Sequence, residues 1–433
     1  MKVPHLQKVL GPLAVCVLLV GCATQEQTAS LEGGAGAAAA GYLLCKAMGK
    51  SDRDCAANAV AGGGVGAGVY YSYELRLENQ QTVIPAAPIP PAPTIPPATD
   101  AGRGGITLLF GTNRTPSTGA LRPRDAFTNV RGSVSYGLVR VSIPASHKVG
   151  TIDRPRTVLG FEFPEDPATH MVILDVSAID PSAISKIADR FFTGRSGARR
   201  AFIFVHGFNV SFADAALRTA QIAVDMDLKE MPVFFSWASK AQEALYTQDE
   251  NTALQTIPDF KAFLKTYMAE SKADQVVLVA HSLGSRIVTQ AIVEMVQVEP
   301  ALAPKLVQLV LAAADLDAAV FKEQIMPVLA AQNVPITLYS STRDKALALS
   351  VKIHGGVRAG SGGKSIVFGR GLESVDASAI DTDFLGHSYF ADTRPLLTDM
   401  ALLVENGLPA SKRPLLMGRP IQAHPPAYWL FKP

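Results

Sequence analysis

The chain has 433 residues, 48% of them hydrophobic, and a formal net charge of +2. This length and apolar content allow a large buried core and more than one region. Acidic and basic residues are mixed along the chain without a basic tract, which argues against nucleic acid as a partner.

The N-terminus has the features of a lipoprotein signal peptide over residues 1–21. Lys2 and Lys8 lead into an apolar run from Val9 to Val20. The run is too short for an ordinary membrane-spanning helix and is typical of a secretory signal. It ends in Leu-Val-Gly-Cys, which resembles the lipobox of bacterial lipoproteins, so Cys22 is the expected site of lipidation. An uncleaved anchor is the alternative.

The other cysteines agree with export. Cys16 lies in the signal and Cys22 is expected to carry lipid, which leaves Cys45 and Cys55 as an even pair. In an oxidising envelope compartment these two thiols can form a disulfide. Two buried free thiols are the alternative.

Residues 22–80 are rich in glycine and alanine. Two overlapping G-x-x-x-G spacings fall between Gly62 and Gly68, and a polar turn at 50–54 divides the segment. Such spacings let helix backbones approach closely, most usefully at a membrane. We expect a membrane-associated helical hairpin, which resembles the glycine-zipper segments of some bacterial envelope lipoproteins. A flexible spacer is the alternative.

A proline-rich linker is predicted over residues 81–104. Seven prolines fall between Pro85 and Pro97. This composition favours polyproline II, which at about 3.1 Å per residue spans roughly 40 Å. We expect a separate domain over 105–413, followed by a C-terminal tail over 414–433.

After the linker, strand-like and helix-like patterns alternate. Strands are expected at 106–110, 138–143, 172–176, 201–205, 233–235, 276–279, 306–311, 336–339 and around 375. Helices are expected at 212–227, 257–270, 285–299 and 317–330. This alternation predicts a mostly parallel sheet with helices on both faces, and a site at the carboxyl ends of its strands.

The strongest chemical signal is the stretch Ala280–Gly284, Ala-His-Ser-Leu-Gly. It follows a buried apolar strand and precedes an amphipathic helix, which is the context of a nucleophile elbow. We therefore expect Ser282 to be a nucleophile. An ordinary helix cap is the alternative.

A serine nucleophile needs a base, and the base needs an orienting acid. In the α/β-hydrolase arrangement the acid and then the histidine follow the serine in the chain. Asp344 lies just past the strand at 336–339, and His387 follows the strand expected around 375. These two residues are the expected acid and base.

Other residues compete for both roles. Asp315 and Asp317 follow the strand ending at Leu311 and are alternative acids, although each also suits a helix cap. His354 is the alternative base, but it lies only ten residues after Asp344, with no obvious room for a helix and the final strand. The default prediction for His147, His170 and His424 is a structural role.

An oxyanion hole needs backbone amides aimed at the developing negative charge. The expected donors are Leu283, just after the nucleophile, and Phe208, in the His-Gly-Phe-Asn stretch after the strand at 201–205. Asn209 is the alternative second donor, and His206 is expected to brace the loop. No metal-ligand spacing or nucleotide-binding glycine loop is present in the sequence, so no cofactor or metal is expected.

Several motifs together are similar to the DUF900 family of α/β-hydrolases. They are the stretches 204–216, 235–237, 280–284 and 376–390. The resemblance runs from about 105 to about 413 and implies an esterase- or lipase-like enzyme with Ser282 as nucleophile, His387 as base and Asp344 as acid. Ala238 and Ala314 stand where relatives often have proline, which affects only the expected loop shape.

We therefore expect an envelope lipoprotein with a serine hydrolase domain, placed at the outer membrane and facing the periplasm of a Gram-negative-type bacterium. Its expected substrate is a carboxylic ester or thioester, and a lipid ester is one candidate. A non-catalytic scaffold that keeps the hydrolase fold and an acyltransferase with the same triad are the alternatives. Tyr246, Asp249 and Glu250 form a polar insertion that lines the cleft or else belongs to a solvated surface.

Overall fold

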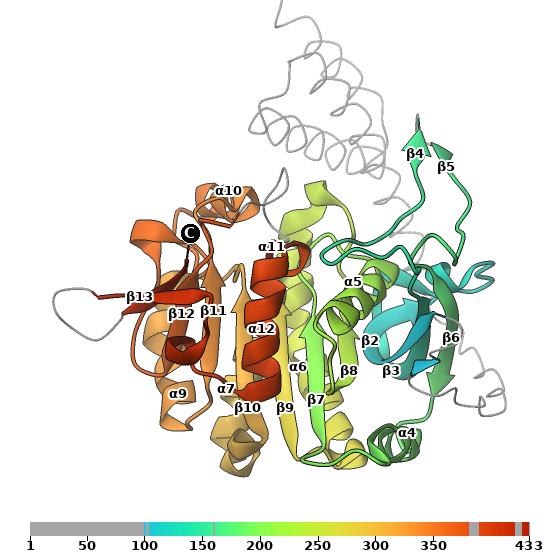
Figure 1. Cartoon of the computed structure of the whole chain (residues 1–433), viewed down its shortest axis with the longest axis horizontal. Helices are drawn as coiled ribbons and strands as arrows, with labels where there is room; N and C mark the ends of the chain where they lie inside the picture. Colours follow the sequence, from blue (N-terminus) through green and yellow to red (C-terminus); the bar gives the residue numbers. More distant parts are fainter. Residues whose placement is uncertain (1–98, 101–103, 159–160, 381–388, 421–426, 433) are drawn as a thin grey trace, which may run out of the picture. The chain divides into compact units, whose positions relative to one another are not determined.

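The computed structural model describes residues 99–100, 104–158, 161–380, 389–420 and 427–432 (Figure 1). The chain divides into two units, Met1–Pro91 and Ala92–Pro433, and every described residue belongs to the second. The signal peptide, the glycine-rich hairpin and the cysteines Cys22, Cys45 and Cys55 therefore lie outside the described residues.

A twelve-stranded sheet forms the centre of the domain. Its order is β13-β14-β12-β11-β10-β9-β7-β8-β2-β3-β6, and β1 pairs with β2. The strands are β1 (Thr99–Asp100), β2 (Gly105–Pro116), β3 (Phe127–Ser142), β6 (Ile173–Ile179), β7 (Arg200–Val205), β8 (Met231–Ser236), β9 (Gln275–His281), β10 (Leu306–Ala312), β11 (Ile336–Ser340), β12 (Leu372–Asp376), β13 (Leu416–Arg419) and β14 (Tyr428–Phe431). A separate small sheet pairs β4 (Thr157–Val158) with β5 (Phe161–Glu162).

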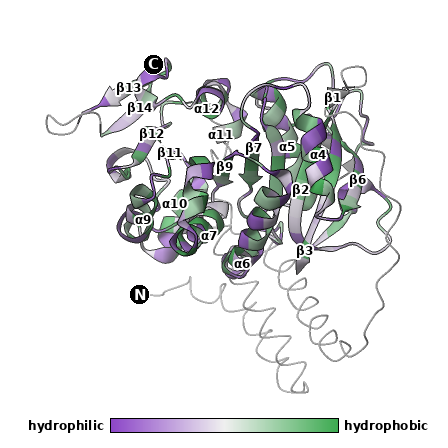
Figure 2. Cartoon of the chain, turned by 90° about the horizontal axis from the view of Figure 1, so that it is seen from below, coloured by the Kyte–Doolittle hydropathy of each residue, from purple (hydrophilic) through white to green (hydrophobic). Residues whose placement is uncertain are grey.

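The sheet is mostly parallel, as predicted. Along the spatial order β14-β12-β11-β10-β9-β7-β8-β2, every neighbouring pair is parallel. Strands β1, β3, β6 and β13 join the sheet in antiparallel pairs. Parallel central strands are buried on both faces, which explains their unbroken apolar sequences. Figure 2 shows the hydrophobic colouring of the central strands β7 and β9.

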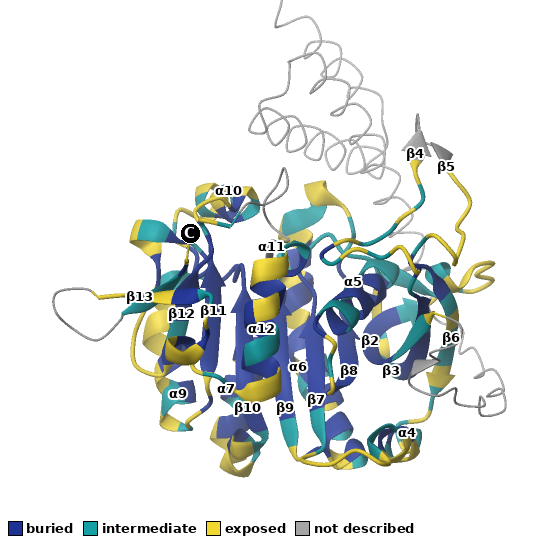
Figure 3. Ribbon diagram, in the orientation of Figure 1, coloured by how far each residue is buried: buried dark blue, intermediate teal, exposed yellow. Residues whose placement is uncertain are grey.

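Helices cover both faces of the sheet. They are α4 (Ala183–Phe192), α5 (Phe212–Asp225), α6 (Tyr246–Ser271), α7 (Gly284–Val298), α8 (Ala318–Val320), α9 (Met326–Ala331), α10 (Lys345–His354), α11 (Tyr389–Asp392) and α12 (Arg394–Asn406). Helices α4, α6, α7 and α9 contribute to one core layer, and α5 and α12 contribute to the other. Alternate residues of β9 serve the two layers: Leu278 lies in the first, and Val277 and Val279 lie in the second. The central strands β7, β8, β9 and β11 are accordingly buried, whereas the outer strands β3, β6 and β13 are partly exposed (Figure 3).

Two predicted boundaries are wrong. Residues 414–433 do not form a separate tail, because β14 pairs in parallel with β12 and β13 pairs with β14. Leu416 and Phe431 are buried in the core there. Helix α6 begins at Tyr246 and not at 257. Its first turns could not be predicted because they are polar and show no apolar periodicity. Among the described helices, none is both long and apolar enough to cross a membrane.

Candidate active site

Ser282 occupies a sharp turn between β9 and α7. Its φ is 50°, in the left-handed region that is uncommon for residues other than glycine. The Ser282 amide donates to the Ala312 carbonyl at 3.0 Å, and the Ser282 carbonyl accepts from the amides of Ser285 and Asp315 at 3.0 and 3.2 Å. These bonds hold the strained turn expected of a nucleophile elbow at the carboxyl edge of the sheet.

Two glycines let the elbow pack against the loop after β7. A Cβ atom at Gly284 would collide with the carbonyl of His206. A Cβ atom at Gly207 would lie only 2.7 Å from the Cβ of Ser282. The two loops are therefore in backbone contact, which is the physical reason for small residues at both positions.

The amides of Leu283 and Phe208 are available as oxyanion donors. Within the described part of the chain, neither amide donates a hydrogen bond to a protein acceptor. The Asn209 amide, by contrast, donates to Asp249 Oδ2 at 3.3 Å. Asn209 is thus occupied, and the alternative second donor is wrong.

Asp249 is fully buried and contacts the loop after β7, residues 206–211, which we call the oxyanion loop. Besides the Asn209 amide, its carboxylate accepts from Ser239 Oγ at 2.6 Å and from the Lys240 amide at 2.7 Å. Burial raises the pKa of Asp249, and the three donors oppose this rise. A solvated surface, one of the two predictions for this stretch, is wrong for this residue.

Arg114, at the end of β2, is a functional candidate that the sequence analysis missed. Its fully buried guanidinium donates from Nη2 to the Val210 carbonyl at 2.7 Å and from Nη1 to the Ser239 carbonyl at 3.1 Å. Burial lowers its pKa to about 9, although Asp249 and Asp214 oppose this. The available signal was the polar run Thr-Asn-Arg at the end of an apolar strand.

His206 is a buried brace of the oxyanion loop. Its Nδ1 lies 2.7 Å from the Gly207 carbonyl, which only accepts, so this nitrogen carries the proton. The ring stacks on Trp237 at 5.3 Å, and Trp237 Nε1 donates to the His206 carbonyl at 2.8 Å. Burial, aided by Arg114, lowers the pKa of His206 to about 3, so the imidazole stays neutral.

The three candidate acids have different environments. Asp344 is buried directly after β11 and caps α10, accepting from the Leu347 amide at 2.9 Å. Asp317 caps α8 through the amides of Ala319 and Val320. Both aspartates follow a strand and both cap the helix that comes next in the chain.

Asp315 is buried in a polar cluster beside the elbow. Its Oδ2 accepts from the Tyr246 hydroxyl, and its Oδ1 accepts from Ser350 Oγ at 2.7 Å. Its Oδ1 also lies 3.4 Å from Arg358 Nε. Both carboxylate oxygens of Asp315 are thus already bound by neighbouring side chains.

The two candidate bases differ in what the structure shows. His387 lies outside the described residues, and helix α11 begins two residues after it in the sequence. His354, at the end of α10, has its Nε2 2.7 Å from Glu250 Oε1 and its Nδ1 2.8 Å from the Ser350 carbonyl. Both His354 nitrogens are therefore engaged by groups other than Ser282.

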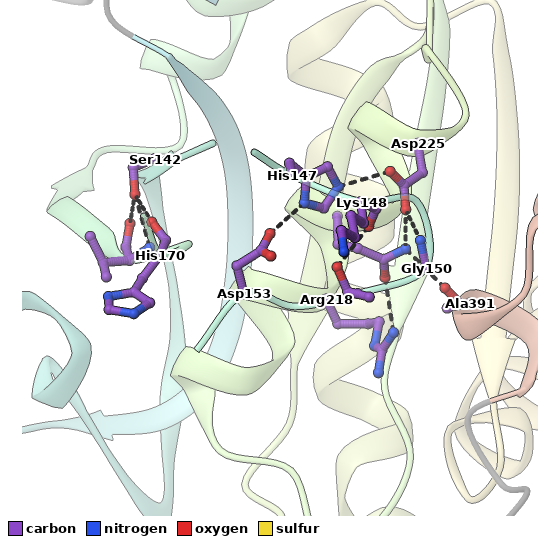
Figure 4. Close-up of polar contacts among 12 residues, drawn as sticks. Ser142, His147, Lys148, Gly150, Asp153, His170, Arg218, Asp225 and Ala391 are labelled. Carbon is purple, nitrogen blue, oxygen red and sulfur yellow. Dashed lines mark hydrogen bonds and ion pairs between the residues drawn. The ribbon is translucent and has the colours of Figure 1, made fainter. Parts of the chain in front are cut away.

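Helix α11 is anchored to α5 by polar contacts (Figure 4). Arg218 pairs with Asp392 at 2.7 Å, and Gln221 donates to the Ala391 carbonyl at 2.9 Å. Asp225 accepts from Gln221 and lies 2.9 Å from Nε2 of His147. His147 therefore has a structural place in this cluster, next to the contacts that hold α11, the helix that follows His387 in the sequence.

Among the described residues, no group of three or more histidine, cysteine, aspartate or glutamate side chains is arranged to hold a metal ion.

The chain was compared with known proteins. One similar solved structure is a predicted CIB-like hydrolase from Thermoplasma acidophilum, with 14% identity, coverage of 49% of this chain and 89% of that chain, and a TM-score of 0.29. Another is described as a hydrolase of the alpha/beta superfamily from Xanthomonas campestris pv. campestris, with 16% identity, coverage of 48% and 99%, and a TM-score of 0.26. A search of curated proteins finds no match.

The family comparison is more informative. The family described as "Alpha/beta hydrolase of unknown function (DUF900)" matches residues 186–405, slightly more than half of the 433 residues. The matched region contains the elbow, the oxyanion loop and all candidate acids and bases. The chain belongs to the DUF900 family of α/β-hydrolases.

Proposed function

We propose that the chain is a serine hydrolase that cleaves carboxylic esters through Ser282, His387 and Asp344. The observation that carries the proposal is the left-handed turn at Ser282, packed against the loop after β7 at Gly207. In the described part of the chain, the amides of Leu283 and Phe208, which follow Ser282 and Gly207, have no protein acceptor. A serine held in this way presents its hydroxyl beside two donors suited to an oxyanion.

Acylation uses these groups in a fixed order. Ser282 Oγ attacks the carbonyl carbon of the ester, its proton passes to His387, and the carbonyl electron pair moves to oxygen. The amides of Leu283 and Phe208 stabilise that oxyanion. When the electron pair returns, the bond to the leaving oxygen breaks, and His387 gives its proton to the departing alcohol. The product is an acyl-enzyme on Ser282.

Deacylation repeats the sequence with water. Water gives a proton to His387 as its oxygen attacks the acyl carbon, and the second oxyanion occupies the same two amides. Its collapse breaks the bond to Ser282 Oγ, which recovers the proton from His387, and the carboxylic acid leaves. A thioester follows the same steps with sulfur as the leaving atom.

Asp344 is the better candidate for the acid that orients His387. It follows β11 at the carboxyl edge of the sheet, and its backbone position is fixed because it caps α10. The carboxylate of Asp315 is already bound by Tyr246 and Ser350. These contacts support Asp344 over Asp315 for this role.

The test uses the full chain in detergent with p-nitrophenyl esters of increasing acyl length. Ser282→Ala is expected to lower kcat by about 10⁶ without changing the melting temperature. Ser374→Ala, a buried serine on β12, is the matched control and should keep its rate. Near wild-type turnover by folded Ser282→Ala would refute the nucleophile. Transfer of the acyl group to an added alcohol in place of water would identify the acyltransferase alternative.

We also propose that Cys22 carries a lipid anchor, that Cys45 pairs with Cys55, and that the domain faces the periplasm from the outer membrane. The lipobox-like sequence and the even cysteine pair support this placement. Labelled palmitate should enter the wild-type chain and not Cys22→Ser, and peptide maps with and without reductant should differ around Cys45. Equal labelling of both chains would reject the anchor.

A further inference from the structure

Two buried charges lie behind the oxyanion loop without neutralising each other directly. Arg114 on β2 and Asp249 on α6 are both 0% exposed. Within the described residues, no ion pair of 4 Å or less joins them. A buried charge is costly unless hydrogen bonds compensate it. The hydrogen-bond partners of these two side chains therefore indicate their structural role.

Arg114 and Asp249 bind different backbone groups of the same two loops, those after β7 and β8. Arg114 binds the carbonyls of Val210 and Ser239. Asp249 binds the amides of Asn209 and Lys240. Arg114, on β2, therefore binds one carbonyl in each of the loops after β7 and β8, and Asp249, on α6, binds one amide in each.

The hydroxyl of Ser239 links the two loops at this point. It donates to Asp249 Oδ2 at 2.6 Å and accepts from the Val210 amide at 3.2 Å. All three partners of Asp249 donate, which suits an ionised carboxylate, because that group only accepts.

This arrangement has a consequence for Phe208. Asn209 has a φ of 57°, a conformation that costs free energy for a residue other than glycine, and its amide is bound to Asp249. The Phe208 amide belongs to the preceding peptide, whose Gly207 carbonyl is bound by His206 Nδ1 at 2.7 Å. Because the two peptides are joined through the Cα of Phe208, holding the Asn209 peptide restricts the directions that the Phe208 amide can take. The Phe208 ring packs edge-on against Tyr246, from the same turn of α6 as Asp249, at 5.2 Å.

We propose that Arg114 and Asp249 are positioning residues that hold the Phe208 amide in the direction of the substrate oxyanion. The inference rests on the proposed function, because it needs Ser282 to form a tetrahedral intermediate. It adds two residues, far apart in the sequence, that touch neither substrate nor nucleophile and act through the loop between them.

The test is Asp249→Asn in the full chain. The substitution keeps the shape, but its NH₂ group faces at least one backbone or hydroxyl donor, so one of the three bonds is lost. Complete loss of one oxyanion donor costs about 10²–10³ in kcat, so a misdirected donor should cost about tenfold or more. KM should change by less than about twofold, because the contact matters in the transition state.

A second readout separates positioning from general destabilisation. A trifluoromethyl ketone forms a tetrahedral adduct with the serine and places an oxyanion in the hole, so its inhibition constant should rise by the same factor as kcat falls. Arg114→Lys, which keeps the charge and loses the planar fork, should behave in the same way.

The matched control is Asp399→Asn, which alters an equally buried carboxylate on α12. It should lower the melting temperature and leave both kcat and the inhibition constant unchanged. Should Asp249→Asn fail to fold, Ser239→Ala removes one donor to Asp249 and should lower kcat several-fold. The proposal is overturned if folded Asp249→Asn or Ser239→Ala keeps wild-type kcat and inhibition.

Failure of the proposed function looks different. If the wild-type chain neither hydrolyses esters nor reacts with a fluorophosphonate, the serine hydrolase is wrong and the positioning role falls with it. If the wild-type chain does both and the variants match it, only the positioning role is wrong.

Discussion

Two buried arginine–aspartate sets in this domain use their charges in opposite ways. At the edge of the sheet, Arg413 Nη1 binds Asp399 Oδ2 directly at 2.6 Å, and the Tyr339 hydroxyl donates to the same oxygen at 2.7 Å. Behind the oxyanion loop, Arg114 and Asp249 bind backbone groups of two loops instead. In the first set the arginine and the aspartate bind each other, whereas in the second set they do not pair and instead hold the two loops.

The pKa values follow this difference. Burial lowers the pKa of Arg114 to about 9. Burial also acts against the charge of Arg413, but Tyr339, Asp399 and Glu373 outweigh it and raise the pKa. A direct ion pair stabilises the fold around it, whereas a charge that is hydrogen-bonded to backbone groups fixes the conformation of a loop. Loss of the first should cost stability, and loss of the second should cost rate.

Among the buried aspartates, the largest effect on rate is expected at a third one, Asp344. Asp344→Asn should lower kcat by about 10⁴ with little change in KM, because the orientation of His387 would be lost. Asparagine caps helices as well as aspartate does, so the melting temperature should hold. Ester kinetics and circular dichroism of Asp344→Asn and Asp315→Asn check this. An active Asp344→Asn beside a folded, inactive Asp315→Asn would move the acid to Asp315.

Asp399→Asn is expected to lower the free energy of unfolding without lowering kcat. Removing the buried partner leaves Arg413 paired only with the partly exposed Glu373, at 2.9 Å. The change should cost about 3 kcal/mol of unfolding free energy, the low end for a broken buried pair. Urea unfolding of this variant and of Asp249→Asn measures the stability, and ester kinetics measure the rate. Loss of kcat in Asp399→Asn equal to that in Asp249→Asn would erase the distinction between the two sets.

The smallest effect concerns pH and His206. The folded pKa of about 3 lies below the unfolded value near 6.5, so below pH 6.5 the unfolded chain binds a proton that the folded chain does not. This stability is full above pH 6.5 and is lost as pH falls toward 3, by about 2 kcal/mol between pH 7.5 and 5. His206→Gln should lose that part of the acid sensitivity.

Tryptophan fluorescence during urea unfolding measures this difference, since Trp237 stacks on His206. The variant must be compared with the wild type, because His147 acts with the opposite sign. Despite its burial, bonds to Asp153 and Asp225 raise its pKa, so its contribution is present at low pH and lost as pH rises. Equal acid sensitivity of both chains would show that His206 is not buried and neutral.

Sequence reasoning reached the features that depend on local pattern. The unbroken apolar run of β9 and the small residues around Ser282 identify the strand and the elbow without any distant contact. Asp344 and His387 were assigned by chain order and by the resemblance to the family, since no local signal separates an acid from a helix cap.

The rest depends on contacts between segments far apart in the chain. Arg114 and Asp249 stand 135 positions apart in the sequence, and only the folded domain brings both to the oxyanion loop. Strands β13 and β14 are four residues each, too short for a periodic signal, and they become strands by pairing with each other and with β12.

The identity of the nucleophile is tested most directly by mapping a fluorophosphonate label on the full chain. Trypsin should release Ala273–Arg286, which contains both Ser282 and Ser285. Fragmentation in the mass spectrometer is expected to place the phosphonyl group on Ser282, and Ser282→Ala should remain unlabelled. An unlabelled, folded wild-type chain, or a label on any other residue, would contradict the assignment of Ser282.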